Sequence, residues 1–173
     1  AAPPDGVGLN VELKERGLAA DVLADLAGLE DWWLSSFDAS ALAAARRAGV
    51  NADSSTGSST GSSTGSTSRS ASASASDPGV VPTALLVDAG DENPISQAVD
   101  LGCRAVHPHV DRCTQEFVAA AHDAGLAVNA WTVRSERTAR RLAEAGVDGV
   151  IADAPAWCLD GPDPAGGNDG LGV

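Results

Sequence analysis

Basic side chains are scarce in this sequence, and some residue types are missing altogether. Lysine occurs once, at Lys14, and the eleven basic residues face 24 acidic ones, for a formal net charge of −13. Proteins that bind nucleic acid or an anionic membrane surface need a basic face, so this charge argues against both partners. Methionine is absent even at position 1. We therefore expect a processed product or a fragment of a longer reading frame.

Other absences narrow the class of protein further. The three cysteines, Cys103, Cys113 and Cys158, form neither a CxxC pair nor an even-numbered framework, which favours buried or incidental thiols. No run approaches the ~20 apolar residues of a membrane-spanning helix. The sequence also contains no P-loop, GxGxxG or HExxH motif. The compartment stays open, because any signal peptide would precede Ala1.

Low-complexity segments reduce the part of the chain that can fold. Residues 54–76 contain only Ser, Thr, Gly and Ala apart from Arg69, beginning with three copies of Ser-Ser-Thr-Gly. Such residues cannot offset the entropy of ordering the backbone. We expect a disordered insertion at 52–78 within a folded unit spanning 1–158, and a disordered Gly-, Pro- and Asp-rich tail at 159–173. An interdomain or mucin-like linker is the alternative interpretation of the insertion.

Short apolar runs alternate with helical patterns along the rest of the chain, which is typical of α/β proteins with a parallel sheet. Strands are predicted near Gly8–Leu13, Trp32–Ser36, Thr83–Val87, Ala105–His107, Ala127–Thr132 and Gly149–Ala152. Helices are predicted at Ala19–Ala27, Ala39–Ala48, Ile95–Leu101, Gln115–Ala124 and Ser135–Ala145. A complete (β/α)₈ barrel typically needs about 250 residues, so the chain is too short to form one.

The first predicted strand carries charges on one face. Side chains alternate along a strand, so Asn10, Glu12 and Lys14 point to one side while Val11 and Leu13 point to the other. Inward-facing charges at the carboxyl end of a barrel strand indicate catalysis. An edge strand with its charges in water is the alternative that the pattern leaves open.

Three segments together resemble the second half of a glycerophosphodiester phosphodiesterase: Leu9–Lys14, Ala130–Val133 and Gly146–Pro155. The resemblance implies a (β/α)₈ TIM barrel of the PLC-like phosphodiesterase type, truncated at its amino terminus to about six βα units. It also implies the family's reaction in lipid metabolism. In that reaction a small-molecule glycerophosphodiester is hydrolysed to glycerol 3-phosphate and an alcohol.

The same resemblance suggests site residues. Glu12 corresponds to one of three family carboxylates that hold a divalent metal, Mg²⁺ or Ca²⁺, and Lys14 to a phosphate contact. Such a cation can neutralise phosphoryl oxygens and activate a nucleophile. Trp131 corresponds to the residue that packs against the glycerol or alcohol portion, although an ordinary core tryptophan is the alternative. Ser36 and Phe37 resemble the family's Ser-Phe strand end at the same rim.

The three histidines are not assigned to catalysis. The family's two catalytic histidines and its other two metal carboxylates lie upstream of the strand that resembles Leu9–Lys14, and neither a His-Arg-Gly nor a His-Asp of that kind precedes it here. We therefore predict no catalytic residue in this chain, and no activity for the fragment alone. His107, His109 and His122 are expected to be structural.

Other functions stay open at this point. A non-catalytic barrel remnant could bind a phosphate ligand or a partner chain with the same pocket residues. The segment Gly146–Ile151 could also belong to another phosphate-binding βα-barrel enzyme, since such barrels bind phosphate at their last strands. An open barrel would expose the edge of the Gly8–Leu13 strand, so we expect the fragment to self-associate.

Overall fold

Six parallel strands follow one another across a single sheet in the computed structural model, which describes residues 8–29, 31–54 and 80–153. Each strand pairs with the next one in the chain, in the order β1-β2-β3-β4-β5-β6. Their bounds are β1 Leu9–Glu12, β2 Trp32–Ser36, β3 Thr83–Val87, β4 Ala105–Pro108, β5 Ala127–Ala130 and β6 Gly149–Val150. Two parallel strands that follow each other in the chain must be joined by a crossover connection. A helix forms the crossover between each pair of successive strands.

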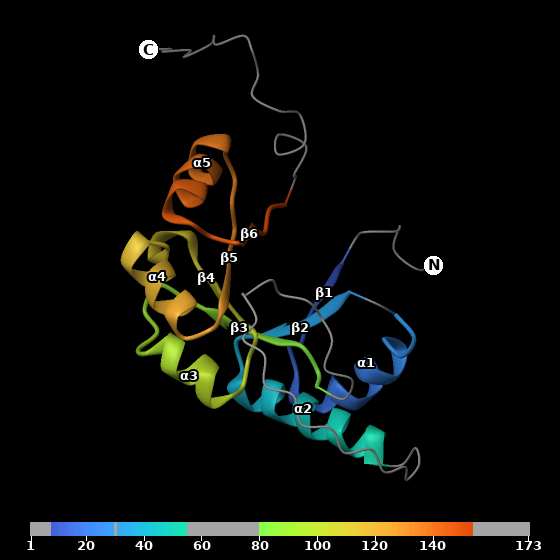
Figure 1. The fold of residues 1–173 in the computed structure, drawn as a ribbon. Coiled ribbons are helices and arrows are strands. Elements are labelled where there is room, and N and C mark those ends of the chain that lie inside the picture. Colours follow the sequence, from blue (N-terminus) through green and yellow to red (C-terminus); the bar gives the residue numbers. More distant parts are fainter. Residues whose placement is uncertain (1–7, 30, 55–79, 154–173) are drawn as a thin grey trace, which may run out of the picture.

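The helices gather along the outer side of a curled sheet (Figure 1). They are α1 Ala19–Asp25, α2 Ala39–Ser54, α3 Pro94–Asp100, α4 Gln115–Asp123 and α5 Glu136–Ala145. Two short 3₁₀ helices, η1 Arg16–Leu18 and η2 Val110–Arg112, follow β1 and β4. This architecture is α/β and confirms the prediction of a truncated (β/α)₈ barrel, because its six parallel strands form a curled half-barrel.

The apolar core lies between the sheet and the helices. Leu34, Leu85 and Val106 are fully or almost fully buried on the outer face of the sheet. They pack in clusters with helix residues, among them Leu42 of α2 and Val118 of α4. Burial of such side chains is the main favourable term for a fold of this kind.

Small side chains form a row across the opposite, inner face. The register aligns Glu12 with Ser35, Ser35 with Ala84, Ala84 with Ala105, and Ala105 with Ala127. Paired residues of parallel strands point to the same side, so this row faces away from the helices. Alanine and serine leave room for the sheet to curl, and Ser35, Ala84 and Ala105 are fully buried.

The predicted strands and helices are all present; β2 and β3 have the predicted bounds, whereas other elements begin or end at different residues. β5 stops at Ala130 and β6 at Val150, before the predicted Thr132 and Ala152. α2 continues to Ser54, beyond the predicted Ala48, and so overlaps the first residues of the predicted insertion, which stays a prediction. An established helix extends at little cost through residues that lack proline. Residues 55–78 of the insertion and the tail 159–173 lie outside the described residues.

Both ends of the sheet carry a partly exposed apolar residue. Leu9 on β1 is 37% exposed and Val150 on β6 is 38% exposed. β1 and β6 each pair with a single neighbour among the described strands. Unpaired strand edges favour pairing with another chain. Self-association of the fragment stays a prediction.

One close contact generates a test of the packing between α2 and the start of β3. A Cβ atom added at Gly49 would lie 2.3 Å from Cγ2 of Val81, which is buried. Alanine normally stabilises a helix by about 1 kcal/mol relative to glycine. Here we expect Gly49→Ala to lower the free energy of unfolding by roughly 1–3 kcal/mol, because Val81 must move. Denaturant unfolding measures the change.

The matched control is Gly17→Ala in η1, where an added Cβ would meet no atom within 4 Å. We expect this control to change stability little. Removing the obstructing methyl groups with Val81→Ala should abolish the additional cost of Gly49→Ala. Stabilisation by Gly49→Ala in the unmodified chain would contradict the packing described here.

Candidate functional site

Several of the sequence-predicted residues lie at one edge of the sheet, where the carboxyl ends of the strands meet. Glu12 ends β1 and Phe37 follows β2, while Trp131 follows β5. Ligands of parallel α/β sheets bind beyond the carboxyl ends of the strands. We call this the carboxyl rim.

Glu12 and Lys14 form an ion pair at the rim. The Lys14 Nζ atom lies 2.9 Å from Glu12 Oε1, and the two side chains are 77% and 36% exposed, respectively. This confirms that the two charges share a side of β1, as strand alternation predicted. An exposed pair of this kind adds little to stability. Both groups are therefore available for interaction with a ligand.

An aromatic cluster of Phe37, Trp131 and His109 joins distant strands at the rim. The rings of Phe37 and Trp131 meet edge to face, with centroids 5.3 Å apart and an interplanar angle of 88°. His109 approaches Trp131 in the same manner, at 5.2 Å and 80°. Because β3 and β4 separate β2 from β5 in the sheet, the Phe37–Trp131 contact depends on the curl. Phe37 remains 46% exposed and can present an apolar surface to a ligand.

Ser36 is oriented differently from its neighbours at the rim. Its hydroxyl donates to the carbonyl of Leu13 at 2.6 Å and accepts from the amide of Asp38 at 3.1 Å. The residue is 1% exposed. Ser36 thus joins the end of β1 to the loop after β2. A direct contact of Ser36 with substrate stays a prediction that these bonds do not support.

Asp38 extends this connection between the loops after β1 and β2. Its carboxylate accepts from the Ser40 amide at 2.8 Å, from the Ser40 hydroxyl at 2.6 Å, and from Arg16 Nε at 2.7 Å. These hydrogen bonds, those from Ser40 above all, hold the pKa of the carboxyl well below its usual range. Asp38 therefore fixes the start of α2 and anchors η1.

His107 is buried on the inner face, one row above the small residues. It is 2% exposed, and its Nε2 atom lies 3.0 Å from Nδ2 of Asn129. Burial lowers the pKa of His107 from 6.5 to about 4. Within the part of the chain that the structure describes, Nδ1 of His107 and Oγ of Ser35 are buried without a hydrogen-bond partner. A neutral imidazole suits this position.

The other two histidines contact polar groups of the chain, one nearby in the sequence and one distant. Nδ1 of His109 accepts from the amide of Asp111 at 3.3 Å, at the start of η2. Nε2 of His122 lies 2.9 Å from Oδ2 of Asp148, which also accepts from the amide of Val128 at 2.8 Å. The structural role of the histidines stays a prediction.

Sequence reasoning missed Arg112, which holds two rim loops together. Its guanidinium donates to the carbonyl of Asp88 at 3.1 Å and to that of Ala89 at 2.8 Å, and it also donates to the carbonyl of Asp91. The acceptors lie in the loop after β3, whereas Arg112 lies in η2 after β4. No local pattern around Arg112 signals this role, because its acceptors are backbone atoms distant in the sequence.

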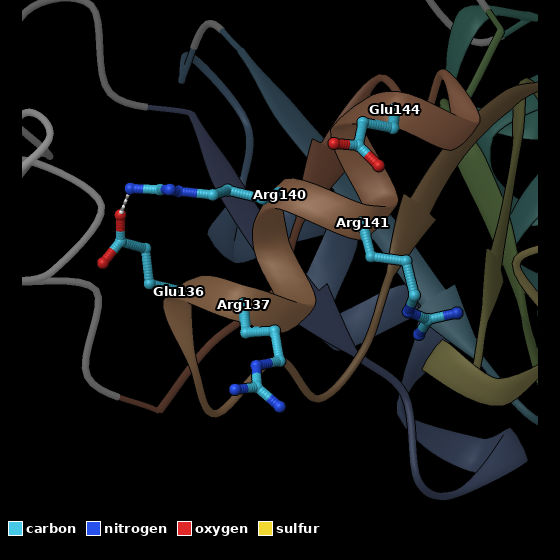
Figure 2. Close-up of a pocket in the computed structure, with 5 residues that line it drawn as sticks. All are labelled: Glu136, Arg137, Arg140, Arg141 and Glu144. Atoms are coloured by element: carbon cyan, nitrogen blue, oxygen red, sulfur yellow. Dashed lines mark hydrogen bonds and ion pairs between the residues drawn. The ribbon is translucent and has the colours of Figure 1, made fainter. Parts of the chain in front are cut away.

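A hollow on the surface of α5 lies away from these residues (Figure 2). All five residues that line it belong to this helix: Glu136, Arg137, Arg140, Arg141 and Glu144. Arg140 pairs with Glu136, and Arg141 donates to the carbonyl of Val110 at 3.0 Å. Because Glu136, Arg140 and Arg141 are already engaged by protein groups and all lining residues belong to α5, we do not assign the site there.

The described residues do not fit a divalent cation by themselves. No group of three or more His, Cys, Asp or Glu side chains converges among them in a way that could hold a metal ion. Glu12 is paired with Lys14 instead.

No helix within residues 8–153, as far as these are described, is long and apolar enough to cross a membrane.

Comparison with known proteins relates the chain to one family. The family model described as "Glycerophosphoryl diester phosphodiesterase family" matches residues 30–157. A candidate glycerophosphoryl diester phosphodiesterase from Silicibacter pomeroyi is similar in structure, with 27% identity and a TM-score of 0.64, over 86% of this chain and 48% of that one. No curated protein matches.

Two further solved structures share the fold. A phosphodiesterase from Oleispira antarctica, solved with the product sn-glycerol-3-phosphate, has 23% identity and a TM-score of 0.59, over 87% of this chain and 53% of that one. A glycerophosphodiester phosphodiesterase from Thermotoga maritima has 19% identity and a TM-score of 0.59, over 88% and 56%. The chain thus spans about half the length of these structures.

The burial of His107 predicts how the free energy of unfolding depends on pH. The unfolded chain takes up a proton at this residue near pH 6.5, whereas the folded chain does so only near pH 4. The stability that neutral burial provides is therefore complete above pH 6.5 and is lost as the pH falls toward 4. We expect roughly 3 kcal/mol to be lost over this window. Denaturant unfolding at several pH values measures it.

The variant His107→Gln removes the titrating group and should flatten the curve between pH 6.5 and pH 4. Nuclear magnetic resonance of the imidazole gives an independent measurement, with a neutral ring expected at pH 5. Titration of His107 near pH 6.5 in the folded chain would show that the ring is not desolvated as described.

Proposed function

This chain belongs to the glycerophosphoryl diester phosphodiesterase family, and from this membership we propose that it forms one side of the active site of a metal-dependent hydrolase. The enzyme would cleave glycerophosphodiesters to glycerol 3-phosphate and an alcohol. The family match over residues 30–157 is the observation that carries the proposal. The product bound to the Oleispira antarctica phosphodiesterase is consistent with it.

The carboxyl rim offers the contacts that such a substrate needs. We assign to Lys14 the neutralisation of a phosphoryl oxygen, because its ammonium is exposed and is the only lysine charge in a chain of net charge −13. Trp131 and Phe37 would pack against the apolar surface of the glycerol or alcohol portion. Their edge-to-face contact fixes the orientation of both rings before the substrate arrives.

Acid–base catalysis requires groups beyond those described here. His107 is neutral and buried, while His109 and His122 are engaged with neighbouring residues. The described residues of the chain thus bind and orient the substrate, and the proton transfers are assigned elsewhere in the active site. We propose that the isolated chain does not turn over a phosphodiester.

A divalent metal, Mg²⁺ or Ca²⁺, is part of this proposal. When bound, such an ion would supply positive charge at the phosphoryl group. Glu12 is the ligand that we assign, and further oxygen ligands would be needed to complete the coordination of a hard cation. The described residues do not hold such an ion by themselves.

Metal binding by the 173-residue chain tests this assignment. With Glu12 as a lone carboxylate, we expect Mg²⁺ and Ca²⁺ to bind no more tightly than about 1 mM, which is weak for a protein Ca²⁺ site. Isothermal titration calorimetry of the chain and of Glu12→Gln measures this. Micromolar binding that Glu12→Gln abolishes would show that this chain completes a metal site without further ligands.

Binding of sn-glycerol 3-phosphate tests the assigned substrate contacts. We expect weak binding that Lys14→Met reduces about tenfold or more, since one charge-assisted hydrogen bond is lost. Arg47→Met is the matched control, because Arg47 is an exposed cation on α2, outside the residues assigned to the rim. Equal binding by the Lys14→Met and Arg47→Met variants would contradict the assignment. Phosphodiesterase turnover by the pure chain would contradict its proposed inactivity.

A further inference from the structure

A chain of contacts links the inner face of β4, β5 and β6. Asn129 on β5 pairs in register with Gly149 on β6. A Cβ atom added at Gly149 would lie 2.5 Å from Oδ1 of Asn129 and 3.3 Å from its Cγ. The side-chain amide of Asn129 thus lies directly against the backbone of Gly149. Any residue larger than glycine at position 149 would place its Cβ atom in the space that this amide occupies. From there, Nδ2 of Asn129 reaches Nε2 of His107 at 3.0 Å.

This contact bears on where the imidazole of His107 carries its proton. Nδ2 of Asn129 faces Nε2 of His107 and can only donate, so this placement of the amide assigns the proton of the neutral ring to Nδ1, which has no hydrogen-bond acceptor among the described residues. Because the ring is 2% exposed, water does not compete for Nε2. Asn129 therefore fixes both the tautomer and the orientation of His107, in the way that a second residue commonly does for functional histidines.

The backbone of His107 in turn holds the indole of Trp131. Nε1 of Trp131 donates to the carbonyl of His107 at 2.6 Å. The amide of Trp131 donates to the carbonyl of Pro108 at 3.0 Å, and its carbonyl accepts from the amide of Val110 at 2.8 Å. The indole is thus fixed along the end of β4, and it also meets the rings of Phe37 and His109.

We propose that Gly149, Asn129 and His107 are positioning residues that hold Trp131 in place at the carboxyl rim. Gly149 leaves room for the Asn129 amide, the amide contacts the His107 ring, and the backbone carbonyl of His107, in β4, accepts from the indole. The functional meaning of this chain of contacts rests on the proposed role of Trp131 as a substrate contact. The structural relation among the four residues does not depend on that role.

Hydrogen exchange at the Trp131 indole tests the proposal in the 173-residue chain. We expect the Nε1–H of Trp131, assigned with the variant Trp131→Phe, to exchange about tenfold faster in Asn129→Ala and in Gly149→Ala, the size expected for one weakened hydrogen bond. The control is Gly146→Ala, which strains a glycine at φ +89 at the end of α5, just before β6, but brings its Cβ no closer than 3.8 Å to Val118. This control should retain the exchange rate of the unmodified chain.

The tautomer of the His107 ring is a second measurement, and a general loss of stability would not change it. Nitrogen chemical shifts should show the proton on Nδ1 in the unmodified chain and a mixture of tautomers in Asn129→Ala. A proton on Nε2 in the unmodified chain would overturn the proposal, as would indole exchange in Asn129→Ala within about twofold of the Gly146→Ala control.

Asn129→Ala introduces no clash, so it serves as the test if Gly149→Ala fails to fold. Loss of sn-glycerol 3-phosphate binding would bear on the proposed function alone. Neither the exchange rate nor the tautomer requires that ligand, so failure of the proposed function and failure of this inference are distinguishable.

Discussion

The parallel pairing of six consecutive strands determines where every side chain of the candidate site lies. Because each strand pairs with its predecessor in a fixed register, one row of inner residues runs from Glu12 through Ser35 and Ala84 to Ala105. The small side chains of this row permit the curl, and the curl brings the end of β2 against the end of β5. A flat sheet with the same sequence pattern would leave Phe37 and Trp131 on separate strands with no contact.

Local sequence patterns were sufficient to predict the elements of this fold, because each depends on neighbouring residues. The buried run Thr83–Val87 and the helix capped by Ser135 are examples. The shared face of Glu12 and Lys14 also follows from alternation within one strand. The continuation of α2 to Ser54 was not predicted, since a compositional change does not by itself end a helix.

Contacts between distant segments could not be predicted in the same way. The orientation of Ser36 toward the carbonyl of Leu13 depends on the register of β1 with β2, which no local pattern specifies. The contact of Asn129 with His107 likewise requires β4 and β5 to be adjacent. The family resemblance predicted which residues lie at the rim. The directions of their side chains depend on the three-dimensional arrangement of the strands and could not be predicted from it.

The three backbone bonds made by Arg112 divide the rim into a stiff part and an adjustable part. One guanidinium binds the carbonyls of Asp88, Ala89 and Asp91, so the loops after β3 and β4 cannot move independently of each other. Lys14, by contrast, is held by one exposed ion pair and keeps the freedom of a long side chain. Accommodation of ligands of different size would therefore fall to the β1 end of the rim, while the part after β3 and β4 keeps a constant shape.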